Sequence, residues 1–288
     1  MSSILQADVY VSSRLPMAIK RAGETSCFSP ISCTLIHGDS EAVLVDTPIS
    51  IAQTEDLVQW IKGTAPNKDI RYIYITHGHA DHWFGISVLR KYWPNLHAIA
   101  TPGTVRHMHD QLVPEILDGL WRTLFPNGQI PENPEIAATM SSPTFQIENH
   151  EFHAVEVGHT DTYNTTVLHI PSIKLVVAGD VVYGDVHQFF GEANTTEKRN
   201  EWLRALDTIE SLQPHMVIAG HKRAGTVDGM FNLYKTRKYI EDFERTVQGS
   251  TGWEELWYKV QALYPNRINP HAILRGAFAA FPESKPLE

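Results

Sequence analysis

Apolar and polar positions alternate in short blocks at the start of the chain. The apolar runs 31–36 and 41–45 flank a polar turn at 37–40, and this arrangement predicts a β-hairpin. Ser50, with a glutamine three residues later, forms a capping box that predicts a helix to about Lys62. The hairpin and the helix suggest a mixed α/β fold.

The next block has the order strand, helix, strand. The run 70–75 is rich in β-branched and aromatic residues and predicts a buried strand. The mostly apolar run 83–93 predicts a helix that Pro94 ends, and 96–100 predicts another short strand. These elements extend the first hairpin into a β-α-β unit.

Residues 101–143 differ from the rest because six prolines interrupt them. Apolar residues at helical spacing predict a helix from about 103 to 124, which Pro114 would kink. We interpret this region as a helical insertion that caps the functional site. His107 and His109 lie within it and are expected to be surface histidines of that helix.

After the insertion the pattern of the first half returns. Strands are predicted at 145–147, 151–157, 165–170, 175–178 and 216–219, and helices at 197–212, 226–247 and 253–263. Two successive runs of β-hairpins followed by β-α-β alternation predict two similar halves. The expected fold is a single domain over 1–288, a four-layer αββα sandwich with a cap at about 101–143.

Composition narrows the choice of partners. The chain has 288 residues, 42% hydrophobic and 20% charged, as expected of a globular protein. A net charge of −9 argues against nucleic acid or an anionic membrane as the main partner, so we expect a small-molecule substrate. A homodimer remains open. Cys27 and Cys33 are expected to be free thiols.

No targeting signal is evident from the pattern. The first eleven residues have neither a basic segment nor an apolar core, so they do not resemble a secretory signal. No run approaches the roughly 18 apolar residues of a membrane span. The expected location is cytoplasmic.

The strongest chemical signal is the run His77-Gly78-His79-Ala80-Asp81-His82. It lies between the predicted strand 70–75 and the helix after it, and Gly78 is expected to let the backbone turn sharply. Imidazoles and a carboxylate on one tight loop can point at a common centre. A metal site explains this motif better than a polar turn does.

Three later segments each place a glycine and a candidate ligand after an apolar strand: Gly158-His159, Gly179-Asp180 and Gly220-His221. Each alone could be structural, but together with the first motif they make seven ligands. A tetrahedral zinc ion uses three or four, whereas two ions about 3.5–4 Å apart would use all seven. Imidazole-rich ligation favours two Zn²⁺ ions, with Fe or Mn as alternatives.

This series of motifs resembles the metallo-β-lactamase superfamily, which implies an αββα sandwich. The resemblance covers about residues 31–221 and implies a role for each ligand. His77, His79 and His159 would bind the first metal; Asp81, His82 and His221 would bind the second, and Asp180 would bridge them. By the same resemblance Asp46 would support the ligands from behind, and Asp81 would move a proton to the leaving group.

A hydroxide shared by two metal ions attacks a carbonyl or phosphoryl centre, so the resemblance implies a hydrolase. Tyr183 follows Asp180 at a spacing similar to the Asp-x-x-Tyr of acyl-homoserine-lactone lactonases, where the hydroxyl contacts the substrate carbonyl. Tyr183 could instead be a packed aromatic. The motif around His159 is similar to bacterial and fungal hydrolases, some of which open the cyclic carbamate of benzoxazolinones in detoxification.

The expected reaction is therefore the opening of a small cyclic lactone, lactam or cyclic carbamate. Trp83, Tyr183, His187 and Phe190 are expected to contact the substrate, although each aromatic could be core instead. A thioester or phosphodiester hydrolase of the same fold is one alternative. A metal-binding protein without catalysis is another, although the complete set of ligands argues against it.

Overall fold

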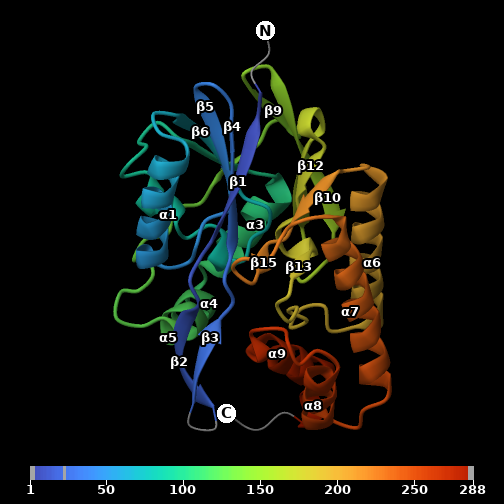
Figure 1. The fold of residues 1–288 in the computed structure, drawn as a ribbon. Coiled ribbons are helices and arrows are strands. Elements are labelled where there is room, and N and C mark those ends of the chain that lie inside the picture. Colours follow the sequence, from blue (N-terminus) through green and yellow to red (C-terminus); the bar gives the residue numbers. More distant parts are fainter. Residues whose placement is uncertain (1–3, 22–23, 285–288) are drawn as a thin grey trace.

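Two β-sheets pack face to face, with helices covering their outer faces (Figure 1). The computed structural model describes residues 4–21 and 24–284. Helix α1 (Ile51–Thr64) lies outside the first sheet, whereas α6 (Thr196–Ser211) and α7 (Met230–Gln248) lie outside the second. This arrangement is the predicted four-layer αββα sandwich.

The first sheet contains the strands predicted for the first half and two more. Its order is β1 (Gln6–Val11), β4 (Ser32–His37), β5 (Glu41–Val45), β6 (Asp69–Tyr74), β7 (His97–Ala100) and β8 (Ala138–Thr139). The pairs β1–β4 and β4–β5 are antiparallel, and the rest are parallel. The predicted hairpin and the strand–helix–strand order are confirmed.

The second sheet has a similar plan. Its order is β14 (Met216–Ile218), β12 (Leu175–Val177), β11 (Thr165–Ile170), β10 (His150–Gly158) and β9 (Thr144–Ile147). Only the pair β12–β14 is parallel. The strands predicted after residue 144 are therefore confirmed, with boundaries that differ by one or two residues.

Side chains of the strands alternate between two apolar layers. In β5, Ala42 and Leu44 face the layer under α1, whereas Val43 and Val45 face the layer between the sheets. In β12, Val176 faces the helices of the second half and its two neighbours face the first sheet. This period of two leaves polar ligands at the strand ends, where the alternation stops.

The chain after the histidine-rich loop is not the predicted helix over 83–93. It forms a 3₁₀ turn at Ala80–His82 and only a short helix, α2 (Ile86–Leu89). Residues 83–89 are buried except for the half-buried Ser87, and exposed residues appear only at Lys91 and Tyr92, near the end of the run. An apolar run of this length is compatible with a buried irregular segment as well as with a helix.

The insertion is helical but broken. It contains α3 (Pro102–Gln111), α4 (Pro114–Ile116), a π-helical turn at Leu117–Trp121 and α5 (Arg122–Leu124). The predicted continuous helix ends before Pro114, because proline disfavours helical backbone at the preceding Val113. His109 is exposed as expected, but His107 is buried.

Smaller elements frame the lower part of the molecule in Figure 1. Strands β2 (Leu15–Arg21) and β3 (Glu24–Phe28) form a hairpin beside α4 and α5. Helix α8 (Trp253–Leu263) matches its prediction, whereas α9 (Pro270–Ala280) was not predicted. None of the helices in the described ranges combines the length and apolar character that crossing a bilayer requires.

The two cysteines are free, as predicted. Cys33 is buried in β4 and Cys27 is half-buried in β3. Burial raises the pKa of the Cys33 thiol well above its usual value, and the carboxyl group of Asp46 adds to this effect. This thiol therefore acts as a small core side chain.

Candidate metal centre

The ends of strands from both sheets meet between the two halves of the sandwich. The histidine-rich loop follows β6, and backbone N–H groups tie it to neighbouring segments: Thr166 N–H donates to Thr76 O at 2.9 Å, and Thr47 N–H to His82 O at 2.8 Å. His221 forms a β-bridge with Ile31 and opens the short strand β15 (His221–Lys222). Rigid neighbours on both sides therefore hold the candidate ligands.

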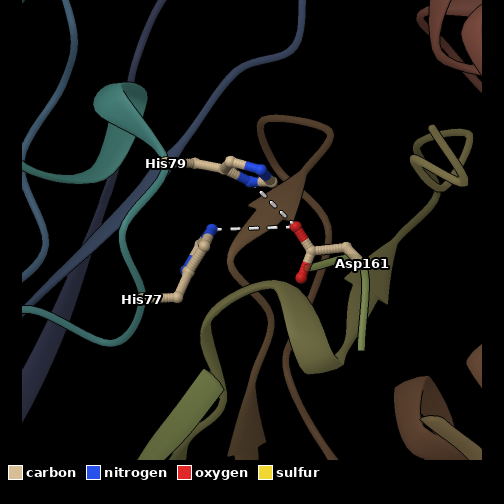
Figure 2. Close-up of side chains that lie close together, drawn as sticks. All are labelled: His77, His79 and Asp161. Carbon is tan, nitrogen blue, oxygen red and sulfur yellow. Dashed lines mark ion pairs between the residues drawn. The ribbon is translucent and has the colours of Figure 1, made fainter. Parts of the chain in front are cut away.

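The first group of candidate ligands consists of His77, His79 and Asp161 (Figure 2). Asp161 Oδ2 lies 3.0 Å from His79 Nδ1 and 3.7 Å from His77 Nε2. The two histidines come from the loop after β6, and Asp161 comes from the loop after β10. The three side chains converge from opposite halves of the molecule.

The second group consists of Asp81, His82 and His221. Asp81 Oδ2 lies 3.2 Å from His221 Nε2 and 3.6 Å from His82 Nε2. All three side chains are buried. Two imidazoles and one carboxylate again face a common centre, as in protein sites for divalent metals.

Asp180 lies between the two groups. Its Oδ1 is 3.2 Å from His82 Nε2, and its Oδ2 is 3.3 Å from His221 Nε2. Asp180 also groups with His77, a member of the first set. Gly220 permits this close approach, because a Cβ atom there would lie 2.4 Å from Asp180 Oδ1. Asp180 therefore contacts candidate ligands of both groups.

Other polar groups hold the Nδ1 atoms of His77 and His82, on the side of each ring away from the centre. His82 Nδ1 lies 2.9 Å from Asp46 Oδ2, and Asp46 also accepts hydrogen bonds from the backbone and the hydroxyl of Thr76. The Thr76 hydroxyl in turn lies 3.1 Å from His77 Nδ1. These contacts leave the Nε2 atoms of both histidines facing the centre, and they give Asp46 its predicted supporting position.

In each of the remaining two imidazoles, a polar group also holds one of the two ring nitrogens. His221 Nδ1 donates to the carbonyl of Pro30 at 2.8 Å, which leaves Nε2 for the centre. His79 is turned the other way: its Nε2 lies 3.0 Å from Glu192 Oε1, and Nδ1 faces Asp161. The Thr162 hydroxyl donates to the second oxygen of Glu192 at 2.6 Å and fixes that carboxylate.

Several buried atoms at the centre have no hydrogen-bond partner. They are His77 Nε2, His82 Nε2, Asp161 Oδ2 and Asp180 Oδ1. These atoms lie at ion-pair distances from one another or from His79, but a buried polar atom without a well-formed hydrogen bond still costs free energy. All four belong to the converging side chains and are the donor atoms that a divalent cation binds. The residues therefore fit a metal centre.

Charges within the cluster support the same conclusion. Burial would raise the pKa of Asp180, but His221 and His82 hold it well below its usual range. Conversely, burial would lower the pKa of His221, and Asp180 and Asp81 raise it to about 10. Ionised carboxylates thus keep protons on buried imidazoles. A divalent cation can replace those protons, since metal binding to histidine releases them.

A family model described as the metallo-beta-lactamase superfamily matches residues 28–221, about two-thirds of the chain. This chain belongs to the metallo-β-lactamase superfamily. The family includes metallo-hydrolases, and the matched segment contains every histidine and aspartate of the two groups. No curated protein sequence matched the chain.

Solved metallo-β-lactamases share the fold. The DIM-1 enzyme exposed to ceftazidime has a TM-score of 0.58 and 18% identity, over 84% of this chain and 99% of that one. The metallo-β-lactamase from Pontibacter korlensis has a TM-score of 0.57 and 18% identity, over 83% and 100%. FIM-1 from Pseudomonas aeruginosa, in its mono-zinc form, has a TM-score of 0.54 and 16% identity, over 83% and 91%.

The structure brings together six of the seven predicted ligands. The exception is His159, which is half-buried, and among the described residues it belongs to no group of three or more candidate ligands. Its Nδ1 donates to the carbonyl of Thr160 at 2.9 Å. Asp161, two residues later, stands with His77 and His79 instead. No residue pattern in the chain distinguished these two positions.

Gly78 lies at a bend of the chain, in line with the predicted turn, and it also makes room for a side chain. It does not have a positive φ. A Cβ atom at this position would lie 2.4 Å from the ring of His107, so glycine makes room for the imidazole from the insertion. This close packing explains why His107 is buried. Burial lowers its pKa to about 4, with a smaller effect from His79.

A cavity of about 210 Å³ opens directly beside the centre. The predicted residues Tyr183 and His187 line it, together with the ligands His79, Asp81, Asp180 and His221. Most of the wall is apolar and comes from three elements: the β2–β3 hairpin, the helical insertion and α9. The wall includes Met17, Phe28, Leu120, Trp121, Leu124 and Ala272.

Two predicted substrate contacts lie elsewhere. Trp83 is fully buried in the core of the first half, and its indole N–H donates to the carbonyl of Gly78 at 2.8 Å. Phe190 is fully buried in the second half, with its ring 3.9 Å from that of Phe243. The neighbouring Phe189 lines the cavity instead. We therefore correct both expectations: Trp83 and Phe190 are core residues.

Sequence reasoning also missed Glu192 and Arg275. Glu192 contacts a candidate ligand, but it follows no motif, and only the fold brings its loop to His79. Arg275 lines the cavity from α9, a helix that the pattern did not predict. A basic residue on an unpredicted helix gives no signal that could have placed it at the site.

Proposed function

We propose that this protein is a dinuclear metal-dependent hydrolase that opens a small cyclic lactone, lactam or cyclic carbamate. One observation carries the proposal: two adjoining groups of imidazole and carboxylate ligands, linked by Asp180, open onto a mostly apolar cavity. Zn²⁺ suits the imidazole-rich set, with Fe or Mn as alternatives. When bound, two such ions supply a hydroxide nucleophile at neutral pH and polarise the substrate carbonyl.

The residues of the chain contribute proton transfer and orientation. Asp81 Oδ2 lies at the cavity beside His221 and is ionised, since His82 and His221 overcome the effect of burial and lower its pKa. A carboxylate in this position can take a proton from the attacking group and pass it to the leaving group. We assign this proton transfer to Asp81.

Tyr183 is the second catalytic residue that we propose. Tyr183 lines the cavity, and its hydroxyl donates to Asp180 Oδ2 at 2.6 Å. Burial and the nearby carboxylate of Asp180 raise its pKa well above the usual value, so the phenol stays protonated. If this single O–H turned from Asp180 to the reacting carbonyl, it would stabilise the oxyanion that forms there.

The walls of the cavity favour an uncharged or weakly charged ring. Phe28, Leu120 and Trp121 present apolar surface opposite the ligands. Residues of the insertion form part of this wall, so we propose that the insertion caps bound substrate. A planar bicyclic carbamate of the benzoxazolinone type fits such a surface, and a detoxification role in the cytoplasm would follow from that substrate.

The cavity is less suited to the alternatives. A phosphodiester or an anionic thioester needs cationic partners, whereas Arg275 is the only lysine or arginine among the described residues that line the cavity. Lys222, next to His221, is paired with Asp228. A non-catalytic metal-binding protein would have no use for Tyr183 and an apolar cavity beside the ligands.

Metal analysis and a substrate panel test the proposal. We expect two equivalents of zinc after reconstitution, and turnover of homoserine lactones, benzoxazolinone or a β-lactam in preference to a glutathione thioester or a phosphodiester. The variant Asp81→Ala should lose one equivalent of zinc and most activity. The matched control Asp207→Ala changes an exposed aspartate on α6 and should lose neither.

Two results would contradict the proposal. If the reconstituted wild-type protein held no metal, the metal centre would be wrong. If it held metal but turned over only the thioester or the phosphodiester, the ring-opening class would be wrong.

A further inference from the structure

We propose that Asp161, and not His159, is the third protein ligand of the divalent cation bound by His77 and His79. This inference rests on the proposed metal centre but concerns a different question, namely which side chain completes the first group. The histidine after Gly158 occupies the motif position from which His159 was predicted. The geometry points to the carboxylate two residues later.

Asp161 has the surroundings of a ligand. Its side chain is 0% exposed, and its Oδ2 faces both His79 Nδ1 and His77 Nε2 (Figure 2). The same Oδ2 has no hydrogen bond, whereas Oδ1 accepts one from the Thr160 hydroxyl at 2.9 Å. One oxygen is thus held by the protein and the other is directed at the imidazoles. Apart from its ion pair with His79, this buried oxygen has no donor, and a bound cation would compensate for the cost of burying it.

His159 has different surroundings. It is half-buried, and its Nδ1 is engaged by the carbonyl of its own neighbour, Thr160. In the part of the chain that the structure describes, it joins none of the groups whose ligand atoms lie within 4.8 Å of one another. Every other predicted ligand does so.

A β-bulge lies directly before the loop that contains the two candidates. Strand β10 pairs with β11 in regular register as far as Glu156 and Thr166, but Gly158 then pairs with Thr165, so β10 contains one extra residue. Gly158 has a φ of +83°, which glycine adopts without strain. The regular register of the strand therefore stops directly before the loop that contains His159 and Asp161.

A threonine-rich turn then directs Asp161 inward. The backbone N–H of Thr160 donates to the carbonyl of Thr162 at 2.7 Å, and the Thr165 hydroxyl donates to the same carbonyl at 3.1 Å. Thr162 also orients Glu192, which holds the far side of His79. One short loop therefore supplies a ligand and fixes the carboxylate behind another.

The exchange changes the chemistry of the site. With Asp161, each group contains two imidazoles and one carboxylate, and Asp180 lies between them. A third imidazole in place of Asp161 would make the first group richer in nitrogen. Oxygen donors favour harder ions, so this centre should accept Mn²⁺ or Fe²⁺ more readily than a site with three imidazoles.

Metal binding by paired variants tests the assignment without relying on activity. Purified wild-type protein, Asp161→Ala, Asp161→Asn and His159→Ala would be stripped of metal and titrated with Zn²⁺ and Co²⁺. Bound equivalents would be measured by elemental analysis and by the visible absorption of Co²⁺. Asp161→Asn keeps the shape of the side chain and serves if Asp161→Ala does not fold, as judged by circular dichroism.

We expect both Asp161 variants to lose one equivalent, or to bind it at least tenfold more weakly, which is the lower end of the effect of removing groups that support a metal ligand. His159→Ala should retain two equivalents. If His159→Ala loses one, alone or together with the Asp161 variants, or if no variant loses one, the assignment is wrong. In either case a wild-type protein with two equivalents still supports the proposed hydrolase, whereas a wild-type protein that binds no metal removes the basis for both.

Discussion

Each imidazole of the metal centre divides its two nitrogens between the centre and a fixed partner. Asp46, Thr76, Glu192 and the carbonyl of Pro30 are these partners. Hydrogen bonds of this kind set the tautomer and the orientation of a ring before any metal arrives. Single residues therefore determine how well the ligand atoms converge.

At this scale we predict the effect of Tyr183→Phe. The change removes the hydroxyl that donates to Asp180 and leaves the ring, which stacks on His221. We expect kcat to fall on the order of a hundredfold, as for the loss of one oxyanion donor, with little change in KM. Steady-state kinetics on the best substrate of the panel would measure this.

A control variant and the metal content of Tyr183→Phe distinguish a role of the hydroxyl in catalysis from a role in positioning Asp180. Tyr264→Phe alters a half-buried tyrosine that does not line this cavity, and it should leave kcat unchanged. Unchanged kcat in Tyr183→Phe would show that its hydroxyl is not used. Loss of a metal equivalent in that variant would show that the hydroxyl acts only by positioning Asp180.

At the scale of elements, the segment between β13 (Tyr183–Gly184) and α6 contributes both to the cavity and to the core of the second half. His187 and Phe189 face the cavity, whereas Phe190 packs with Phe243 and Trp202 under the outer helices. The same segment includes Glu192, behind His79. Cavity lining, core packing and support of a candidate ligand thus lie within six residues.

This division predicts opposite effects for two neighbouring substitutions. Phe190→Ala should lower the free energy of unfolding by about 3–5 kcal/mol, as for large-to-small changes in a core. Phe189→Ala should cost under about 1 kcal/mol in stability but raise KM roughly fivefold through lost apolar contact. Urea unfolding and steady-state kinetics would measure the two effects. Similar stability losses in both variants would contradict the assignment of the two rings.

At the scale of the whole molecule, the metal centre joins the two halves of the sandwich. The loop after β6 supplies four of the candidate ligands, and Asp161, Asp180 and His221 come from the second half. Direct hydrogen bonds also cross here, such as that between the hydroxyls of Tyr74 and Thr166 at 2.7 Å. A cation bound at the centre would add to this attachment.

Metal binding should therefore stabilise the folded chain. For each site, a free zinc concentration of a hundred times Kd should add about 2.7 kcal/mol to the free energy of unfolding. Urea unfolding in zinc buffers would measure this gain, with chelated protein as the reference. The gain should be smaller in Asp81→Ala. Equal stability at all zinc concentrations would contradict binding at this centre.

The sequence by itself determined the parts of this protein that depend on local pattern. Short continuous apolar runs end at the glycines beside Asp180 and His221, so both the strands and the ligands at their ends could be predicted. The motif from His77 to His82 contains four potential ligands within six residues, and no distant contact is needed to recognise it. Family, fold and most of the candidate centre followed from these segments.

Only the tertiary structure decided the parts that depend on register and on packing over long distances. The conformation of the loop after Gly158 places Asp161, and not His159, beside His77 and His79, and hydrogen bonds within that loop have no reliable signature in one sequence. Whether Phe189 or Phe190 lines the cavity depends on a helix more than fifty residues away. Glu192 reaches His79 across 113 positions for the same reason: a side chain acquires such a role only when the fold brings its partner to it.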